Sequence, residues 1–145
     1  MTPAKTTAGA TTRLLSIAIT VEDLDRAVRW WERVFGFEVV ARTRFEAVGA
    51  DVALIKGLGF RLELLQVAER CRIAALTAEP PAHLLPIGNK SLVLETDDLK
   101  ATSRALEEHG VTFIWRERDF GVLGHATAIR DSEGNLINIF QRQEP

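Results

Sequence analysis

Hydrophobic and polar residues follow one another along this chain in short runs that occur in the same order twice. Apolar runs without helical spacing predict strands, and an apolar stripe repeating every three to four residues predicts a helix. In the first half these patterns predict a strand, a helix and three strands at residues 14–21, 24–35, 37–45, 50–56 and 60–67. In the second half they predict the same order at residues 91–96, 99–109, 111–116, 126–130 and 136–141.

Each predicted helix is bounded by residues that favour its start and its end. Asp23 and Asp98 precede the two helical segments. At that position a carboxylate accepts hydrogen bonds from unpaired backbone N–H groups and meets the positive end of the helix dipole. Gly36 and Gly110 follow the segments, and glycine readily adopts the left-handed conformation that ends a helix. Both halves are therefore predicted to be β-α-β-β-β modules.

The two halves also correspond residue by residue. The run SIAITVEDL, which begins at Ser16, is matched by SLVLETDDL, which begins at Ser91, an interval of 75 positions. Glu63 and Asn138 stand in corresponding strands at the same interval. A constant interval between similar runs indicates a duplicated module. We therefore expect the four equivalent positions Ser16, Glu63, Ser91 and Asn138 to converge in space.

The duplication divides the chain into four segments. We expect a disordered, Thr- and Ala-rich tail at residues 1–12, modules at 13–67 and 89–142, and a crossing segment at 68–88. A connection of about 20 residues is long for a compact domain and is often a lid or a binding loop. The simpler interpretation, which we favour, is a crossing segment with a short helix around residues 72–77.

Composition excludes several classes of function. The chain has 18 basic and 20 acidic residues and a net charge of −2, which argues against a nucleic-acid partner. No apolar stretch reaches the roughly 20 residues of a membrane span, so we expect no membrane partner. The single cysteine, Cys71, cannot form an intramolecular disulfide and favours a reducing, cytoplasmic location.

The doubled module and several of its segments resemble the vicinal oxygen chelate superfamily, which includes glyoxalase I, extradiol dioxygenases and bleomycin-resistance proteins. The matching segments are IAITVEDLDRAV at 17–28, WWERVFGFE at 30–38, EEHGV at 107–111 and DSEGN at 131–135. The resemblance implies an α+β fold in which the two modules form an open, cup-shaped mixed β-barrel, with the helices outside and a small organic ligand inside. It also implies a homodimer.

The same resemblance identifies the positions of possible metal ligands. Metal-dependent members place His on the first strand of each module and Glu, Gln or His near the end of each fourth strand. Those positions are Ser16, Glu63, Ser91 and Asn138 in this chain. Divalent ions need several anionic or imidazole donors, and one carboxylate, one amide and two hydroxyls would bind them weakly. We therefore expect no metal and no other cofactor.

Further candidate residues follow from the alternation of side chains along strands. Residues two apart share a face, so Arg61 is expected to point into the cavity with Glu63. The two could orient a polar ligand, provide a general base, or form a structural pair, with Ser16, Ser91 and Asn138 completing a neutral polar network.

The remaining candidates are one polar residue and two aromatic residues on strands, together with the histidines. Thr43 on the second strand and Phe113 and Trp115 on the sixth are expected to line the cavity, where the aromatic rings could stack on a planar ligand or pack in the core. His83 in the crossing segment could lie over the cavity mouth, whereas His125 is expected to point away from it.

Three functions stay open. The first is metal-independent binding of a small organic ligand, as in the bleomycin-resistance branch. The second is a cofactor-independent enzyme of the epimerase, cyclase or lyase type that uses Glu63 as general base. The third is a metal-dependent lyase or dioxygenase with displaced ligands, such as Glu63 with His83 or His125. The sequence favours the first, because the usual ligand set is incomplete and no nucleophile with a neighbouring base is evident.

Overall fold

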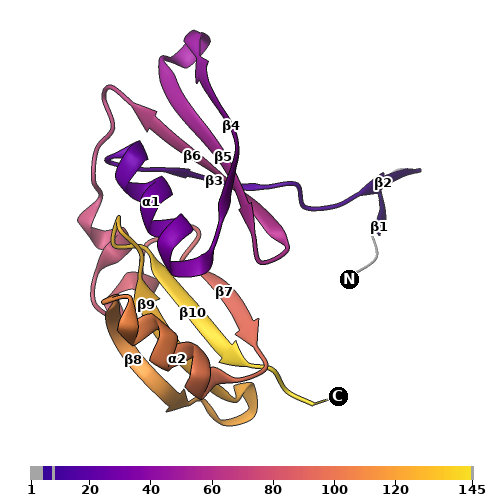
Figure 1. Cartoon of the computed structure of the whole chain (residues 1–145), viewed down its shortest axis with the longest axis vertical. Coiled ribbons are helices and arrows are strands. Elements are labelled where there is room, and N and C mark those ends of the chain that lie inside the picture. The colour runs from indigo at the N-terminus through magenta and orange to yellow at the C-terminus, as the bar shows by residue number, and fades with distance from the viewer. Residues whose placement is uncertain (1–4, 8, 145) are drawn as a thin grey trace.

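A computed structural model of the chain describes residues 5–7 and 9–144, and the two predicted modules form one after the other within them (Figure 1). The first contains β3 (Ile17–Thr20), α1 (Leu24–Phe35), β4 (Glu38–Phe45), β5 (Ala50–Gly57) and β6 (Phe60–Val67). The second contains β7 (Ser91–Thr96), α2 (Leu99–Glu108), β8 (Thr112–Asp119), β9 (His125–Arg130) and β10 (Leu136–Gln141). The α+β fold and the duplicated order of elements are thereby confirmed.

Each module forms one four-stranded mixed sheet. The strand orders are β3-β6-β5-β4 and β7-β10-β9-β8. The first and fourth strands of each module pair in parallel, with Ile17 opposite Leu62 and Leu92 opposite Ile137, so the register is the same in both copies. Among the described residues no strand of one sheet pairs with a strand of the other, and the sheets do not join into a closed barrel.

The helix ends agree with the predicted capping residues. The Asp23 side chain accepts a hydrogen bond of 3.0 Å from the backbone N–H of Arg26, and Asp98 accepts one of 3.0 Å from Ala101. The bond from Arg26 lowers the pKa of the Asp23 carboxyl below its ordinary value. Gly36 ends α1 in the left-handed conformation, with φ of 68°.

The hydrophobic core lies between the helices and one face of each sheet. Helix α1 contacts β5 and β6, and α2 contacts β8, β9 and β10. Trp31 is 1% exposed and packs against the rings of Trp30, Phe35 and Phe37. The core extends without a break into the second module, where it includes Ile129. Within residues 9–144, neither α1 nor α2 packs on the other face of its sheet.

Two segments outside the modules contain more structure than a tail and a linker. Lys5–Thr7 and Ala10–Thr12 pair as the antiparallel hairpin of β1 and β2, which projects from the body (Figure 1). Threonine favours strands, and Gly9 with φ of 82° allows the turn, so this part of the expected disordered tail is ordered. Residues 1–4 of that tail, and residue 8, lie outside the described residues.

The crossing segment contains short helical turns at Ala74–Thr77 and Ala82–Leu84, and the first overlaps the helix predicted around residues 72–77. None of the described helices is long and apolar enough to cross a membrane.

A buried carboxylate joins the two modules. Glu133, in the β9–β10 turn, is 6% exposed; its side chain accepts a bond from the backbone N–H of Glu22 and one of 2.8 Å from the Arg26 guanidinium. The bond from Arg26 to Glu133 raises the pKa of the arginine above its ordinary value. The turn itself is held by Asp131, which accepts 2.9 Å bonds from the N–H groups of Glu133 and Asn135.

We predict that Glu133→Ala lowers the free energy of unfolding by about 1.5–3 kcal/mol, because hydrogen bonds to a charged group contribute roughly that much. Urea denaturation at 25 °C measures the change. Glu107→Ala is the matched control, since Glu107 is 65% exposed and pairs with Arg116 at 3.3 Å on the surface. The control should lose less than about 1 kcal/mol. Equal losses in the two variants would contradict a special role for Glu133.

Candidate ligand-binding site

Each sheet has an open face, which is the face turned away from the helices. Leu62 and Leu64 of β6 are buried in the core, so Glu63 between them points to the opposite side. Residues directly opposite across a sheet share a face. The register therefore defines a first open face with Ala18, Glu63, Leu54 and Ala41 in one row and Thr20, Leu65, Val52 and Thr43 in the next.

The second open face is built in the same way. Ile137 and Ile139 are buried in the core, so Asn138 between them points to the opposite side. Its row across the sheet consists of Val93, Asn138, Ala128 and Trp115. Asn138 thus occupies in the second module the place that Glu63 occupies in the first. The predicted equivalence of these positions is confirmed by the register.

The four equivalent positions lie on two separate sheets, two on each. Ser16 directly precedes β3, and Ser91 is the first residue of β7. Within residues 9–144, no side-chain hydrogen bond or ion pair joins any of Ser16, Glu63, Ser91 and Asn138 to another. Arg61 and Glu63 are both partly buried and do not form an ion pair there either. The neutral polar network considered from the sequence is therefore not formed by these contacts.

An aromatic cluster covers much of the second open face. Phe120 lies 5.4 Å from Trp115 and 6.1 Å from Phe140, measured between ring centroids. Beneath these rings the sheet carries only small side chains, because Ala126 and Ala128 of β9 are both fully buried. These small residues of β9 leave room for the large rings of the neighbouring strands, Trp115 of β8 and Phe140 of β10. The three rings therefore form one aromatic surface on this face.

Two polar atoms within this face have no partner. The indole Nε1 of Trp115 and the side-chain oxygen of Asn138 are buried, and neither forms a hydrogen bond within the described part of the chain. One is a donor and the other an acceptor, and they stand on either side of Ala128 in the same row. A buried polar group left unpaired costs about 1–3 kcal/mol. Such groups are usually satisfied by a ligand or an ordered water molecule.

The structure separates the two aromatic residues that were predicted to line the cavity together. Phe113 pairs with Ile129 and packs against the core, whereas Trp115 pairs with Ala128 on the open face. A register shift between them inserts Ile114 as an extra residue. Because a bulge changes the alternation of side chains, residues two apart no longer share a face.

The histidines lie in three different surroundings. His83 is 7% exposed in the crossing segment, and its buried Nδ1 has no partner among the described residues. His125 is exposed at the start of β9, two residues before the core-facing Thr127, and so lies on the helix side as expected. No three His, Cys, Asp or Glu side chains lie close enough to hold a metal ion in the part of the chain described.

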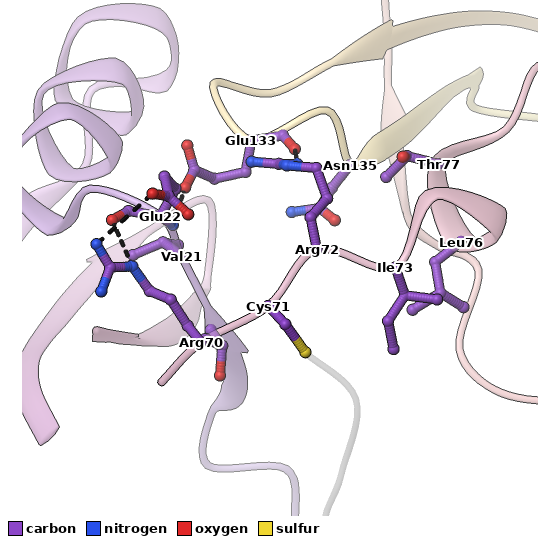
Figure 2. A pocket seen from close by; sticks show the side chains of 11 residues that line it. Val21, Glu22, Arg70, Cys71, Arg72, Ile73, Leu76, Thr77, Glu133 and Asn135 are labelled. Carbon is purple, nitrogen blue, oxygen red and sulfur yellow. Dashed lines mark hydrogen bonds and ion pairs between the residues drawn. The ribbon is translucent and has the colours of Figure 1, made fainter. Parts of the chain in front are cut away.

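One small cavity lies at the module junction (Figure 2). It has a volume of about 130 Å³ and is lined by the crossing segment, the end of β3 and the β9–β10 turn. Arg70 donates 2.8 Å bonds to the carbonyl oxygens of Glu22 and Val67, and Arg72 donates one of 2.7 Å to that of Glu133. Because its arginines already bind protein groups, we interpret this cavity as part of the junction.

Sequence reasoning missed Phe120, Phe140 and Arg118 of the second open face. Phe140 stands two residues after Asn138, and alternation could have placed it there. Phe120 comes from the turn after β8, and Arg118 reaches the face through a second bulge. Neither of these two positions follows from a simple alternating pattern.

Comparison with known proteins agrees with this architecture. Three solved structures share the fold, at sequence identities that show the fold alone. A glyoxylase/bleomycin resistance protein/dioxygenase domain from Frankia sp. EAN1pec is 17% identical, with a TM-score of 0.71 over 91% of this chain and 98% of that chain. The fosfomycin resistance protein FosX from Listeria monocytogenes is 12% identical, with a TM-score of 0.67 over 91% and 94%. TioX from Micromonospora sp. ML1 is 20% identical, with a TM-score of 0.61 over 88% and 97%.

No curated protein sequence matches the chain significantly. The model of one protein family, however, matches residues 13–139, which include both modules and the crossing segment between them. The chain therefore belongs to the Glyoxalase/Bleomycin resistance protein/Dioxygenase superfamily.

Proposed function

We propose that the chain binds a small organic ligand on its second open face without a metal ion. The observation that carries this proposal is the buried, unpaired donor and acceptor formed by Trp115 Nε1 and Asn138 Oδ1. A ligand that accepts from the indole and donates to the amide, as a carboxamide or lactam does, would satisfy both groups at once when the side chains that bury them move aside to admit it. The aromatic cluster beside them offers ring faces to a planar ligand.

The donor chemistry of the site supports the absence of a metal. The fold family includes proteins that use a divalent ion, but only Glu63 among the four equivalent positions is an ordinary ligand for one. The described residues contain no cluster of three His, Cys, Asp or Glu side chains. Two hydroxyls and an amide do not replace the anionic or imidazole donors that such an ion needs. The residues at these four positions therefore do not fit a divalent ion.

We further propose that a homodimer encloses the ligand. All eight residues of β4 are exposed, and Val93 on the second open face is 63% exposed. Large apolar side chains are also exposed nearby in each module, including Phe45 and Leu123 at 56% and 63%. Apolar surface of this kind is typical of a face that another protein covers. On this proposal Ser16, Thr43, Ser91 and the crossing-segment residue His83 lie at the edges of the binding site.

The single cysteine favours a cytoplasmic setting.

A cofactor-independent enzyme is the second candidate. Its supporting observation is that Glu63, on the first open face, is partly buried without an ion pair or hydrogen bond to Arg61 or to any other described side chain. A carboxylate in that state is available to accept a proton from a substrate held near both open faces. Arg61, two residues away on the same strand, would then orient an anionic or carbonyl oxygen of the substrate.

2-Naphthamide, a planar ring system that carries a carboxamide, is the probe for this site. Trp115→Phe removes the indole N–H and keeps an aromatic ring, and we expect it to weaken binding of 2-naphthamide about fivefold to thirtyfold. This range corresponds to about 1–2 kcal/mol for one buried hydrogen bond. Isothermal titration calorimetry measures the dissociation constant. Phe113→Leu is the control, because Phe113 packs against the core on the helix side. Its dissociation constant should change less than about twofold, and an equal effect of both variants would contradict the proposed site.

Protein purified without a metal-binding tag should contain far less than one transition-metal ion per chain. The reason is the lack of imidazole and anionic donors around Glu63. Elemental analysis by mass spectrometry measures the content, and the affinity for 2-naphthamide should be the same before and after dialysis against a chelator. A near-stoichiometric ion whose removal abolishes binding would refute metal independence.

Glu63→Gln distinguishes the two candidate functions, since it keeps the shape and hydrogen-bonding capacity of the side chain and removes the base. For a binding protein we expect ligands to be recovered chemically unchanged from both forms, as mass spectrometry would show. If the original protein converts a compound and Glu63→Gln lowers that rate at least about 100-fold, a typical contribution of a general base, the enzyme hypothesis replaces the binding hypothesis.

A further inference from the structure

Arg118 reaches the second open face through an irregularity in β8. Trp115 is opposite Ala128 and Arg118 is opposite Ala126, so three steps along β8 correspond to two along β9. Ala126 and Ala128 share a face because they are two residues apart. Trp115 and Arg118 therefore share that face although they are three apart, and the extra residue lies between them.

The extra residue requires a backbone conformation that side chains disfavour. Glu117 has φ of 51°, in the left-handed region, without being glycine. A residue in this conformation persists only where its surroundings hold it, and such residues cluster at binding and catalytic sites. The surrounding structure must therefore stabilise the bulge.

That support comes from a buried polar pair on the helix side of the sheet. The N–H of Glu117 donates a 3.0 Å hydrogen bond to the Thr127 hydroxyl, which lies 2.8 Å from the Ser103 hydroxyl of α2. Thr127 and Ser103 are both fully buried. The bond from Glu117 replaces a regular sheet contact at the bulge, and Ser103 fixes the orientation of the threonine. Helix α2 thus holds the bulge from the face opposite to Arg118.

The guanidinium of Arg118 lies against the aromatic cluster. It is 5.5 Å from the ring centroid of Trp115 and 5.3 Å from that of Phe120. The side chain is exposed, and no carboxylate pairs with it among the described residues. Two other arginines of this module have such partners, since Arg116 pairs with Glu107 and Arg142 pairs with Glu95. Arg118 therefore combines a fixed position on two rings with unused hydrogen-bond donors.

We propose that Arg118 is a specificity-determining residue that selects a planar aromatic ligand with a negatively charged group, such as a carboxylate, in addition to the carboxamide or lactam group that meets Trp115 and Asn138. The ring stacks on the aromatic cluster, and the anionic group pairs with the guanidinium, whose planar donors match a carboxylate in bidentate geometry. Ser103 and Thr127 act as positioning residues, because they hold the bulge that brings Arg118 to the face. This inference rests on the proposed function and adds the charge of the ligand to it.

The test compares 2-naphthamide with 6-carbamoyl-2-naphthoate, which adds a carboxylate to the same molecule, by isothermal titration calorimetry. The original protein should bind 6-carbamoyl-2-naphthoate at least about tenfold more tightly, as a charge-assisted hydrogen bond predicts. Arg118→Gln should reduce this preference to less than about twofold. A preference that survives in Arg118→Gln, or no preference in the original protein, would overturn this inference alone. Failure of both ligands to bind would overturn the proposed function and this inference with it.

The positioning role of the bulge has its own variants. Thr127→Val keeps the shape and removes the hydroxyl, and we expect it to reduce the preference for 6-carbamoyl-2-naphthoate at least about threefold, less than the loss of the charged group itself. Thr127→Ser, which keeps the hydroxyl, should restore the preference. Glu117→Gly, which permits the same φ without strain, should also keep it. Equal preferences in Thr127→Val and Thr127→Ser would overturn the positioning role.

Discussion

The parallel pairing of the first and fourth strand of each module is the constraint on which the rest of the structure depends. A parallel pair needs a long connection, and α1 or α2 supplies part of it while packing on one face of the sheet. Each module has only one helix, so only one face of each sheet is covered. The core therefore gathers between helices and sheets, and the opposite faces stay open for other contacts.

The two open faces differ because duplication preserved the backbone and changed the side chains. At the equivalent position the first face has the carboxylate of Glu63 and the second has the amide of Asn138. On the second face, buried Ala126 and Ala128 lie beneath the rings of Trp115, Phe120 and Phe140. An unpaired indole N–H and an unpaired amide oxygen are part of the same face. On the proposed function, this surface of rings with two unsatisfied polar atoms holds a planar molecule and no metal ion.

The sequence predicted the elements that depend on local pattern. The strands at 60–67, 91–96 and 136–141 have the predicted limits, and Asp23, Asp98 and Gly36 cap the helices as expected. These features succeeded because capping and hydrophobic spacing act over a few residues. The duplicated register also followed, since Ser16 and Ser91, like Glu63 and Asn138, stand at one fixed interval.

Features that depend on contacts between distant segments could not be predicted in the same way. The bulges of β8 place Phe113 in the core and Arg118 on the open face, and the second bulge is stabilised by Thr127 and Ser103 from other elements. The junction at Glu133 joins segments more than 100 positions apart. The packing of modules and subunits determines whether the two open faces meet in one cavity. A local sequence pattern does not predict that packing.

The central claim is that the buried polar atoms of the second open face bind a ligand directly. Nuclear magnetic resonance of the tryptophan indole N–H groups, titrated with 2-naphthamide, tests it most directly. The account predicts that the Trp115 resonance, assigned by its loss in Trp115→Phe, shifts saturably, while those of Trp30 and Trp31 in the core change little. A Trp115 resonance that stays fixed while calorimetry reports saturable binding would contradict the account.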